Sequence, residues 1–113
     1  MEYKFSRCFC LQIPNVEEAI EFYRTTMGLK LVRRDSEVIE LGAGEFRFFL
    51  DQGTPLGPIM EYIVPDLQAA KEELLTKGCQ VVSWGGKGKP CYLRDPFGMV
   101  FNVFEEAFIK SKI

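Results

Sequence analysis

The side chains able to do chemistry in this chain are carboxylates, thiols, tyrosines and lysines, because its 113 residues include no histidine. Histidine is the most frequent general base at neutral pH and the commonest metal ligand in proteins. Its absence excludes Ser-His-Asp and Cys-His catalysis, and it excludes zinc, iron or nickel sites that need imidazole. Any catalysis by this chain must therefore use one of the four remaining groups.

The cysteines at positions 8, 10, 79 and 91 are the next chemical candidates. They are too few for a disulfide scaffold in a chain of this length, and their spacing matches no CxxC…CxxC zinc pattern. Cys8 and Cys10 lie in an apolar run, where cysteine packs as a small hydrophobic side chain. We predict buried free thiols, with a redox or metal-binding role as the alternative.

A glycine-rich segment, Gly85-Gly86-Lys87-Gly88-Lys89, offers amides and lysines that could attract an anion if the segment acts as a lid. A flexible hairpin connection with solvated lysines explains the same residues. The segment is not a P-loop, because the GxxxxGK[ST] spacing is absent. Both interpretations stay open from the sequence.

Charge and hydropathy limit the class of protein. The chain has 14 lysines and arginines against 16 aspartates and glutamates, so its net charge of −2 provides no basic face for nucleic acid. Its apolar runs are far shorter than the roughly 20 residues of a membrane-spanning helix. The N-terminus, Met1-Glu2-Tyr3-Lys4, lacks the basic and apolar regions of a secretory signal. We expect a soluble, cytoplasmic protein of one domain.

Hydrophobic patterning predicts a strand, a helix and three further strands in the first half of the chain. The first strand, at 5–13, ends at Pro14, and Asn15 then caps a helix with Glu18 as a capping-box-like partner. The apolar face of this helix follows helical spacing, and Gly28 ends it. The three following strands are expected at 29–32, 37–41 and 45–50.

The second half repeats this order after a linker at residues 51–58, which holds two glycines and two prolines. A strand at 59–64 leads through Pro65 and Asp66 into a second helix that ends at Gly78. Strands at 80–84, 90–93 and 99–104 follow, the last two joined by a type I turn at Asp95-Pro96-Phe97-Gly98. The tail at 105–113 is predicted either to form a frayed helical turn or to dock on a partner.

The two halves are copies of one pattern. Ile13-Pro14-Asn15-Val16 returns as Val64-Pro65-Asp66-Leu67 at a constant offset of 51 residues, each time at a strand-to-helix junction. We therefore predict an α+β chain of two βαβββ modules that form a curved mixed sheet around a central cavity. Module one spans about 1–53, the linker about 51–58, module two about 59–104, and the tail 105–113.

These features resemble the vicinal oxygen chelate superfamily, the group of glyoxalases, bleomycin-resistance proteins and extradiol dioxygenases. The resemblance rests on the two modules, on Glu21-Phe22-Tyr23 followed by Met27-Gly28-Leu29, and on the late Asp95-Pro96-Phe97-Gly98 turn. It covers nearly the whole chain. It implies a scaffold whose enzymes hold a divalent metal with four side chains, two from each module.

The positions that this resemblance assigns to metal ligands carry unsuitable side chains here. The first ligand commonly lies seven residues before the helix cap, which is Cys8 in module one and Ile59 in module two. The closing-strand ligand falls at Asn102, and the remaining ligand falls at Phe48 or Phe49. Isoleucine and phenylalanine cannot donate to a metal, and neutral asparagine is a weak ligand. We therefore expect no metal and no other cofactor.

Strand alternation predicts the lining of the expected cavity, which is mostly apolar and aromatic with a few polar groups. The predicted ligand-binding residues are Cys8, Cys10, Phe48, Phe49, Ile59, Glu61, Trp84, Tyr92 and Asn102. Each has a structural alternative, as core filling for the phenylalanines and as structural hydrogen bonds for Glu61 and Asn102. If catalysis occurs, Glu61 or Cys8 is the expected acid-base group.

Three functions fit these observations. The first is a small-molecule-binding protein, similar to metal-free members of the superfamily that sequester planar or hydrophobic compounds, with an apolar or aromatic ligand and a homodimeric assembly. The second is a glyoxalase-like lyase or isomerase, or a dioxygenase-related enzyme, with atypical metal ligands or a Glu61 or Cys8 acid-base site. The third is a dimeric interaction or regulatory module with a vestigial pocket. The linker permits the modules to pair within one chain or to exchange with a second chain.

Overall fold

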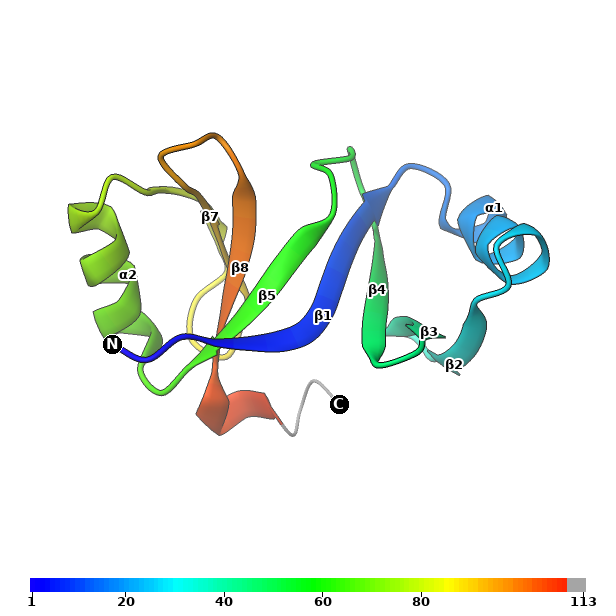
Figure 1. Ribbon diagram of the computed structural model, residues 1–113, viewed down its shortest axis with the longest axis horizontal. Helices are drawn as coiled ribbons and strands as arrows, with labels where there is room; N and C mark the ends of the chain where they lie inside the picture. Colours follow the sequence, from blue (N-terminus) through cyan, green and yellow to red (C-terminus); the bar gives the residue numbers. More distant parts are fainter. Residues whose placement is uncertain (110–113) are drawn as a thin grey trace. The chain divides into compact units, whose positions relative to one another are not determined.

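The computed structural model describes residues 1–109 and has the predicted order of elements in both halves (Figure 1). A strand, a helical segment and three strands occur twice, which confirms the α+β class and the two βαβββ modules. The elements are β1 (Lys4–Ile13), α1 (Val16–Glu21), η1 (Phe22–Thr26), β2 (Lys30–Arg34), β3 (Ile39–Ala43), β4 (Phe46–Gln52), β5 (Ile59–Val64), α2 (Leu67–Thr76), β6 (Gln80–Trp84), β7 (Cys91–Arg94), β8 (Val100–Glu105) and η2 (Glu106–Phe108).

The chain divides into two compact units. We call Arg7–Ile59 the N-unit, and Met1–Ser6 with the chain from Met60 onward the C-unit. The first six residues thus group with the second module, although the sequence assigned them to the first. Their contacts explain this, because the Tyr3 hydroxyl donates to Glu73 Oε1 at 3.3 Å and the N-terminal ammonium lies 3.5 Å from Glu73 Oε2.

The N-unit sheet has the strand order β2-β3-β4-β1, in which β1 and β4 run parallel and the other pairs run antiparallel. Helix α1 covers one face of this sheet. Ile20 from the helix is buried against Leu41 and Leu50 from the strands, with Leu11 and Ile13 packed around them. This core fixes which side of each strand faces the helix.

The sequence predicted a regular α-helix up to Gly28, and the structure differs from this prediction. It widens at Phe22 into the π-helical turn η1, in which the Met27 amide donates to the Phe22 carbonyl at 3.2 Å. The Thr25 hydroxyl donates to the Glu21 carbonyl at 2.7 Å. Such side-chain bonding competes with the regular backbone ladder, which helps to explain the wider turn. Gly28 follows with φ +75° and ends the segment as predicted.

Both helices begin at the predicted caps. Asn15 Oδ1 accepts from the Glu18 amide at 3.1 Å, and Asp66 Oδ1 accepts from the Ala69 amide at 3.0 Å. In each case the side chain satisfies an amide that the first helical turn would leave without a partner. The Glu105 carboxylate adds a hydrogen bond at the start of α2, where it accepts from the Leu67 amide at 2.8 Å.

The C-unit sheet has the equivalent order β5-β8-β7-β6, with β5 and β8 parallel. Helix α2 covers one of its faces. The core under α2 is made by the buried side chains of Val64, Leu67, Ala70, Cys79, Cys91, Leu93 and Val103. All four cysteines of the chain are buried and free, which confirms the prediction from their spacing.

The turn before β8 has the backbone hydrogen bond of the predicted type I turn, and the Asp95 side chain adds two more. The Gly98 amide donates to the Asp95 carbonyl at 3.1 Å, and Asp95 Oδ1 accepts from the amides of Phe97 and Met99, each at 2.9 Å. After β8 the tail forms the short 3₁₀ turn η2, while residues 110–113, part of the tail prediction, lie outside the described residues. Within residues 1–109, no helix combines the length and the apolar character needed to cross a bilayer.

Candidate functional site

Three polar side chains form a row across the sheet face of the C-unit that α2 does not cover. Glu61 on β5 lies opposite Asn102 on β8, and Asn102 lies opposite Tyr92 on β7. Their strand neighbours Val103 and Leu93 pack in the core under α2. Because successive side chains on a strand point to opposite faces, the three polar side chains lie on the other face. We call them the polar row.

A hydrogen bond joins two members of the polar row. Asn102 Nδ2 donates to Glu61 Oε2 at 3.0 Å, and both residues are buried, with Glu61 only 1% exposed. Burying a carboxylate is costly unless hydrogen bonds compensate it, and Asn102 supplies one. A carboxylate has about four acceptor positions, so it can accept from more than one donor.

The surroundings of the polar row are apolar. Ile63 and Phe104 face each other one step farther along β5 and β8, and both are buried. Ile59, also buried, lies on the same side of β5 as Glu61. Apolar side chains around a few fixed polar groups are the usual composition of a small-molecule site.

The equivalent row of the N-unit differs in chemistry. Cys10 on β1 lies opposite Phe49 on β4, and Phe49 lies opposite Glu40 on β3. The duplication therefore carries a carboxylate and an amide in the C-unit where the N-unit carries a thiol and a phenyl ring. Cys8 lies two residues before Cys10 and is buried as well.

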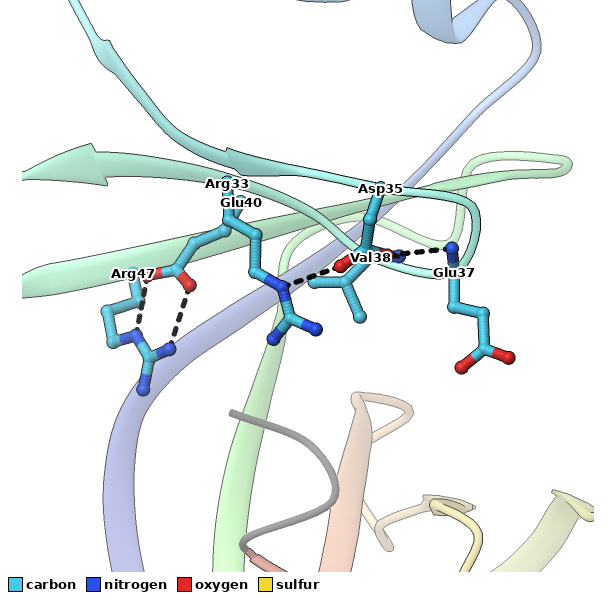
Figure 2. A network of polar contacts seen from close by, with 6 residues as sticks. All are labelled: Arg33, Asp35, Glu37, Val38, Glu40 and Arg47. Atoms are coloured by element: carbon cyan, nitrogen blue, oxygen red, sulfur yellow. Dashed lines mark hydrogen bonds and ion pairs between the residues drawn. The ribbon is translucent and has the colours of Figure 1, made fainter.

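Glu40 is engaged by an arginine within the N-unit. Arg47 donates from Nε and Nη2 to the two oxygens of Glu40 at 2.7 and 2.8 Å, as Figure 2 shows. The guanidinium carbon also lies 5.1 Å from the centroid of the Phe49 ring. Hydrogen bonding to Glu40, opposed by partial burial, raises the pKa of Arg47. Because both oxygens of Glu40 accept hydrogen bonds from Arg47, we interpret Glu40 as a structural group and not as a catalytic base.

The turn between β2 and β3 has its own polar network, also drawn in Figure 2. Asp35 Oδ1 accepts from the amides of Glu37 and Val38 at 2.9 and 2.8 Å, and Asp35 Oδ2 accepts from Arg33 Nε at 2.7 Å. These bonds, the backbone ones first, lower the pKa of Asp35. The network shapes an exposed turn.

The structure distinguishes between the two phenylalanines that the sequence left as alternatives. Phe49 shares its strand face with the residues opposite it, Cys10 and Glu40. Phe48 points to the other face, where it packs against the core under α1 and stacks on Phe9 with 5.5 Å between ring centroids. Phe48 therefore fills the core, the structural alternative given for it.

Trp84 does not lie on the face of the polar row, although the sequence grouped it with the same cavity. It pairs with Cys91 and packs against the core under α2, with Lys71 Nζ 4.6 Å from its ring centroid. A register shift between Val81 and Ser83 interrupts strand alternation, which explains why linear spacing misplaced it. Trp84 instead borders a hollow of about 500 Å³ at the start of α2, together with Lys87 from the glycine-rich segment.

The sequence did not predict a larger groove in the N-unit. It has a volume of about 680 Å³ and lies among the end of β1, the helix α1 with η1, and the segment Pro55–Pro58. Phe22 and Tyr23 contribute aromatic rings to it, and Glu18 contributes a carboxylate. The sequence signal that could have revealed it is the pair of adjacent aromatic residues in a helix, since only one can face the core.

A family model for the glyoxalase-like domain matches residues 8–104. The chain belongs to this family. The match spans both βαβββ modules and confirms the resemblance to the glyoxalase, bleomycin-resistance and dioxygenase superfamily. No protein of curated function matches the sequence.

Solved structures with the glyoxalase-like fold resemble this chain. A glyoxalase/bleomycin resistance protein/dioxygenase superfamily member from Vibrio splendidus 12B01 has 13% identity and a TM-score of 0.63, over 93% of this chain and 98% of that one. Methylmalonyl-CoA epimerase from Mycobacterium tuberculosis has 18% identity and a TM-score of 0.59, over 94% and 90%. Homoprotocatechuate 2,3-dioxygenase from Brevibacterium fuscum has 19% identity and a TM-score of 0.64, over 93% of this chain and 37% of that one. At these identities the likeness shows the fold alone.

The side chains of this glyoxalase-like domain do not fit the four-ligand divalent metal site that the resemblance implies. Across residues 1–109, no group of three or more histidine, cysteine, aspartate or glutamate side chains could hold one ion. The C-unit row offers one carboxylate, Glu61, and one neutral amide, Asn102. The N-unit row offers the soft thiol of Cys10, while Arg47 engages Glu40. A thiol and a carboxylate favour different metals, so this donor set is poor for either class.

Proposed function

We propose that this glyoxalase-like protein binds a small apolar or aromatic molecule on the sheet face of the polar row, without a resident metal ion. The observation that carries the proposal is the buried hydrogen bond between Glu61 and Asn102. It orients a carboxylate among buried side chains, of which Ile63 and Phe104 are apolar. Such surroundings offer affinity through apolar contact and orientation through one acceptor.

The chemistry of the row favours a ligand with a hydrogen-bond donor. Asn102 already donates to one oxygen of Glu61, so the carboxylate acts as an acceptor toward the ligand as well. Tyr92, opposite Asn102, adds an aromatic ring with a hydroxyl at its tip. A fused aromatic alcohol such as naphthol has these properties, and methoxynaphthalene is its matched compound without the donor.

A thermal-shift experiment on the full chain tests this proposal. We expect naphthol to raise the Tm of the wild type more than methoxynaphthalene does. Glu61→Gln turns a charged acceptor into a neutral amide and should reduce the naphthol affinity roughly five-fold. Tyr92→Phe should also reduce it, whereas Tyr62→Phe, the same change on the helix-covered face, should not. Equal shifts in all four proteins, or no shift in any, would argue against binding at the polar row.

A second candidate is a metal-independent proton-transfer enzyme, and the placement of Glu61 and Tyr92 on the same row of the sheet favours it. Glu61 and Tyr92 both border Asn102, so a carboxylate and a phenol share one row on the sheet. Two such groups could remove and return a proton next to a carbonyl group. The test is incorporation of deuterium from heavy water into a methylmalonyl thioester. Incorporation that Glu61→Gln abolishes would favour the enzyme, and its absence would favour simple binding.

We also propose that the protein is cytoplasmic and assembles as a homodimer. Both expectations come from the sequence and from the family resemblance. Sedimentation equilibrium of the full chain tests the assembly, with twice the monomer mass expected. A monomer at all concentrations would contradict it.

A further inference from the structure

The groove of the N-unit has the size and walls of a ligand site of its own. Its volume of about 680 Å³ falls within the roughly 300–1,000 Å³ of small-molecule pockets and suits a molecule of three fused rings. Leu11, Ile13 and Ala19 line it with aliphatic groups, and Pro55 and Pro58 border it from the linker. All of these residues belong to the N-unit, so the groove is complete within that unit.

Two aromatic rings form one corner of the groove. The ring centroids of Phe22 and Tyr23 are 5.7 Å apart and their planes meet at 69°. Phe22 is 51% exposed, and it begins the π-helical turn η1. Turns of this kind are rare and occur often at functional sites. An exposed aromatic face attracts a flat molecule, and it attracts a cation more strongly than a neutral one.

The polar side chains that line the groove include the carboxylate of Glu18 and the amide of Gln12. Glu18 contributes a carboxylate, and within residues 1–109 it forms no ion pair, whereas its neighbour Glu17 pairs with Arg34. Gln12 also lines the groove, and its Oε1 is buried with no hydrogen-bond partner in the part of the chain that the structure describes. The lining contains no lysine and no arginine. The negative charge of Glu18 and the Oε1 of Gln12, unpartnered within the described residues, both favour a cation that carries N–H donors.

We propose that this groove binds a planar organic cation with N–H donors, at a site separate from the polar row. The cation lies against the Phe22 ring, its charge is balanced by Glu18, and an N–H group reaches Gln12 Oε1. The proposal does not depend on ligand binding at Glu61. It adds a second ligand class to the protein, because the ligand proposed for the polar row is a neutral aromatic alcohol.

Fluorescence titration of the full chain with ethidium, a planar cation with two amino groups, tests the proposal. We expect saturable binding that weakens about ten-fold in Phe22→Ala and about three-fold in Glu18→Gln. Two matched changes outside the groove should leave it unchanged, namely Phe97→Ala at an 89% exposed ring and Glu21→Gln on the same helix. Phenanthridine, the neutral parent ring system, should compete only weakly at neutral pH.

The titration also separates this site from the polar row. Ethidium binding that is lost in Glu61→Gln but kept in Phe22→Ala would overturn the proposal, because it would assign the cation to the sheet face. Equal binding by wild type, Phe22→Ala and Glu18→Gln would overturn it as well, as would no binding by the wild type. The Tm of each variant serves as a folding control, and both groove changes replace half-exposed or exposed side chains. Failure of naphthol to bind at Glu61 would leave the ethidium result intact.

Discussion

Asn102 on β8 donates from Nδ2 to Glu61 Oε2 on the parallel strand β5, at 3.0 Å, and water reaches neither residue to a significant extent. The pair occupies a row whose counterpart in the other module is Cys10 and Phe49. At equivalent positions, one module thus carries a hydrogen-bonded carboxylate and amide, and the other carries a thiol and a phenyl ring. This asymmetry is the basis for placing the proposed aromatic ligand on the second module.

Two substitutions of Glu61 should separate the contribution of its shape to stability from the contribution of its charge. Glu61→Ala leaves the buried amide of Asn102 without this acceptor, which costs about 1–3 kcal/mol of unfolding free energy before any cavity effect. Glu61→Gln keeps the shape and an acceptor oxygen, so its cost should be smaller. Urea unfolding of the three proteins measures the difference. A Glu61→Ala variant as stable as the wild type would show that the hydrogen bond contributes nothing.

The bidentate pair of Arg47 and Glu40 should make a single substitution destabilising, whereas a double substitution should cost much less stability. Arg47→Ala leaves the buried carboxylate of Glu40 without its partner, and we expect a loss of about 2–3 kcal/mol, reduced from the fully buried case because Arg47 is one-third exposed. Replacing both residues together, as Glu40→Leu with Arg47→Met, should restore most of the stability. A double variant less stable than Arg47→Ala would contradict this account.

Asp35 should contribute an acid-sensitive part of the stability. Its folded pKa is lowered from the ordinary value by the amides of Glu37 and Val38 and by Arg33. The sign follows from linkage: the contribution is complete above the unfolded pKa and disappears as the pH falls through the folded pKa. Asp35→Asn should therefore flatten the acid limb of a plot of Tm against pH. An unchanged acid limb would contradict the role assigned to this carboxylate.

Tyr3 should contribute a part of the stability that is lost at alkaline pH. Burial, and then the negative charge and hydrogen bond of Glu73, raise the pKa of Tyr3 to about 12 from 10.0. Because the unfolded chain ionises first, stability is full below pH 10.0 and falls progressively up to about pH 12. Tyr3→Phe should remove a tyrosinate absorbance step near pH 12 and weaken this alkaline loss of stability. A titration in which every tyrosine ionises near pH 10.0 would contradict the placement of Tyr3.

The elements of the fold were predictable because their signals are local. Asn15 and Asp66 cap helices through bonds to amides three residues later, and such caps can be read from short sequence motifs. Strand alternation was enough to predict that Glu61 and Asn102 belong to one set of residues on the same side of their strands. Their direct contact could not be predicted, because the register of β5 on β8 depends on pairing between distant segments.

Departures from regular geometry account for what the sequence missed. The register shift before Trp84 moved that ring to the helix-covered side of its sheet. The π-helical turn at Phe22 changed the end of a helix that spacing had predicted to be regular, and it borders the unpredicted groove. For Trp84, the displacement of one residue in the backbone changed which face of the sheet the ring occupies.

The asparagine side-chain amides provide the most direct test of ligand binding at the polar row. The chain contains two asparagines, and Asn15 lines the N-unit groove while Asn102 belongs to the polar row. In a nitrogen-15 NMR titration with naphthol, we predict that the Asn102 side-chain amide resonances shift and that those of Asn15 do not. Saturable naphthol binding that leaves the Asn102 resonances unmoved would contradict the central claim.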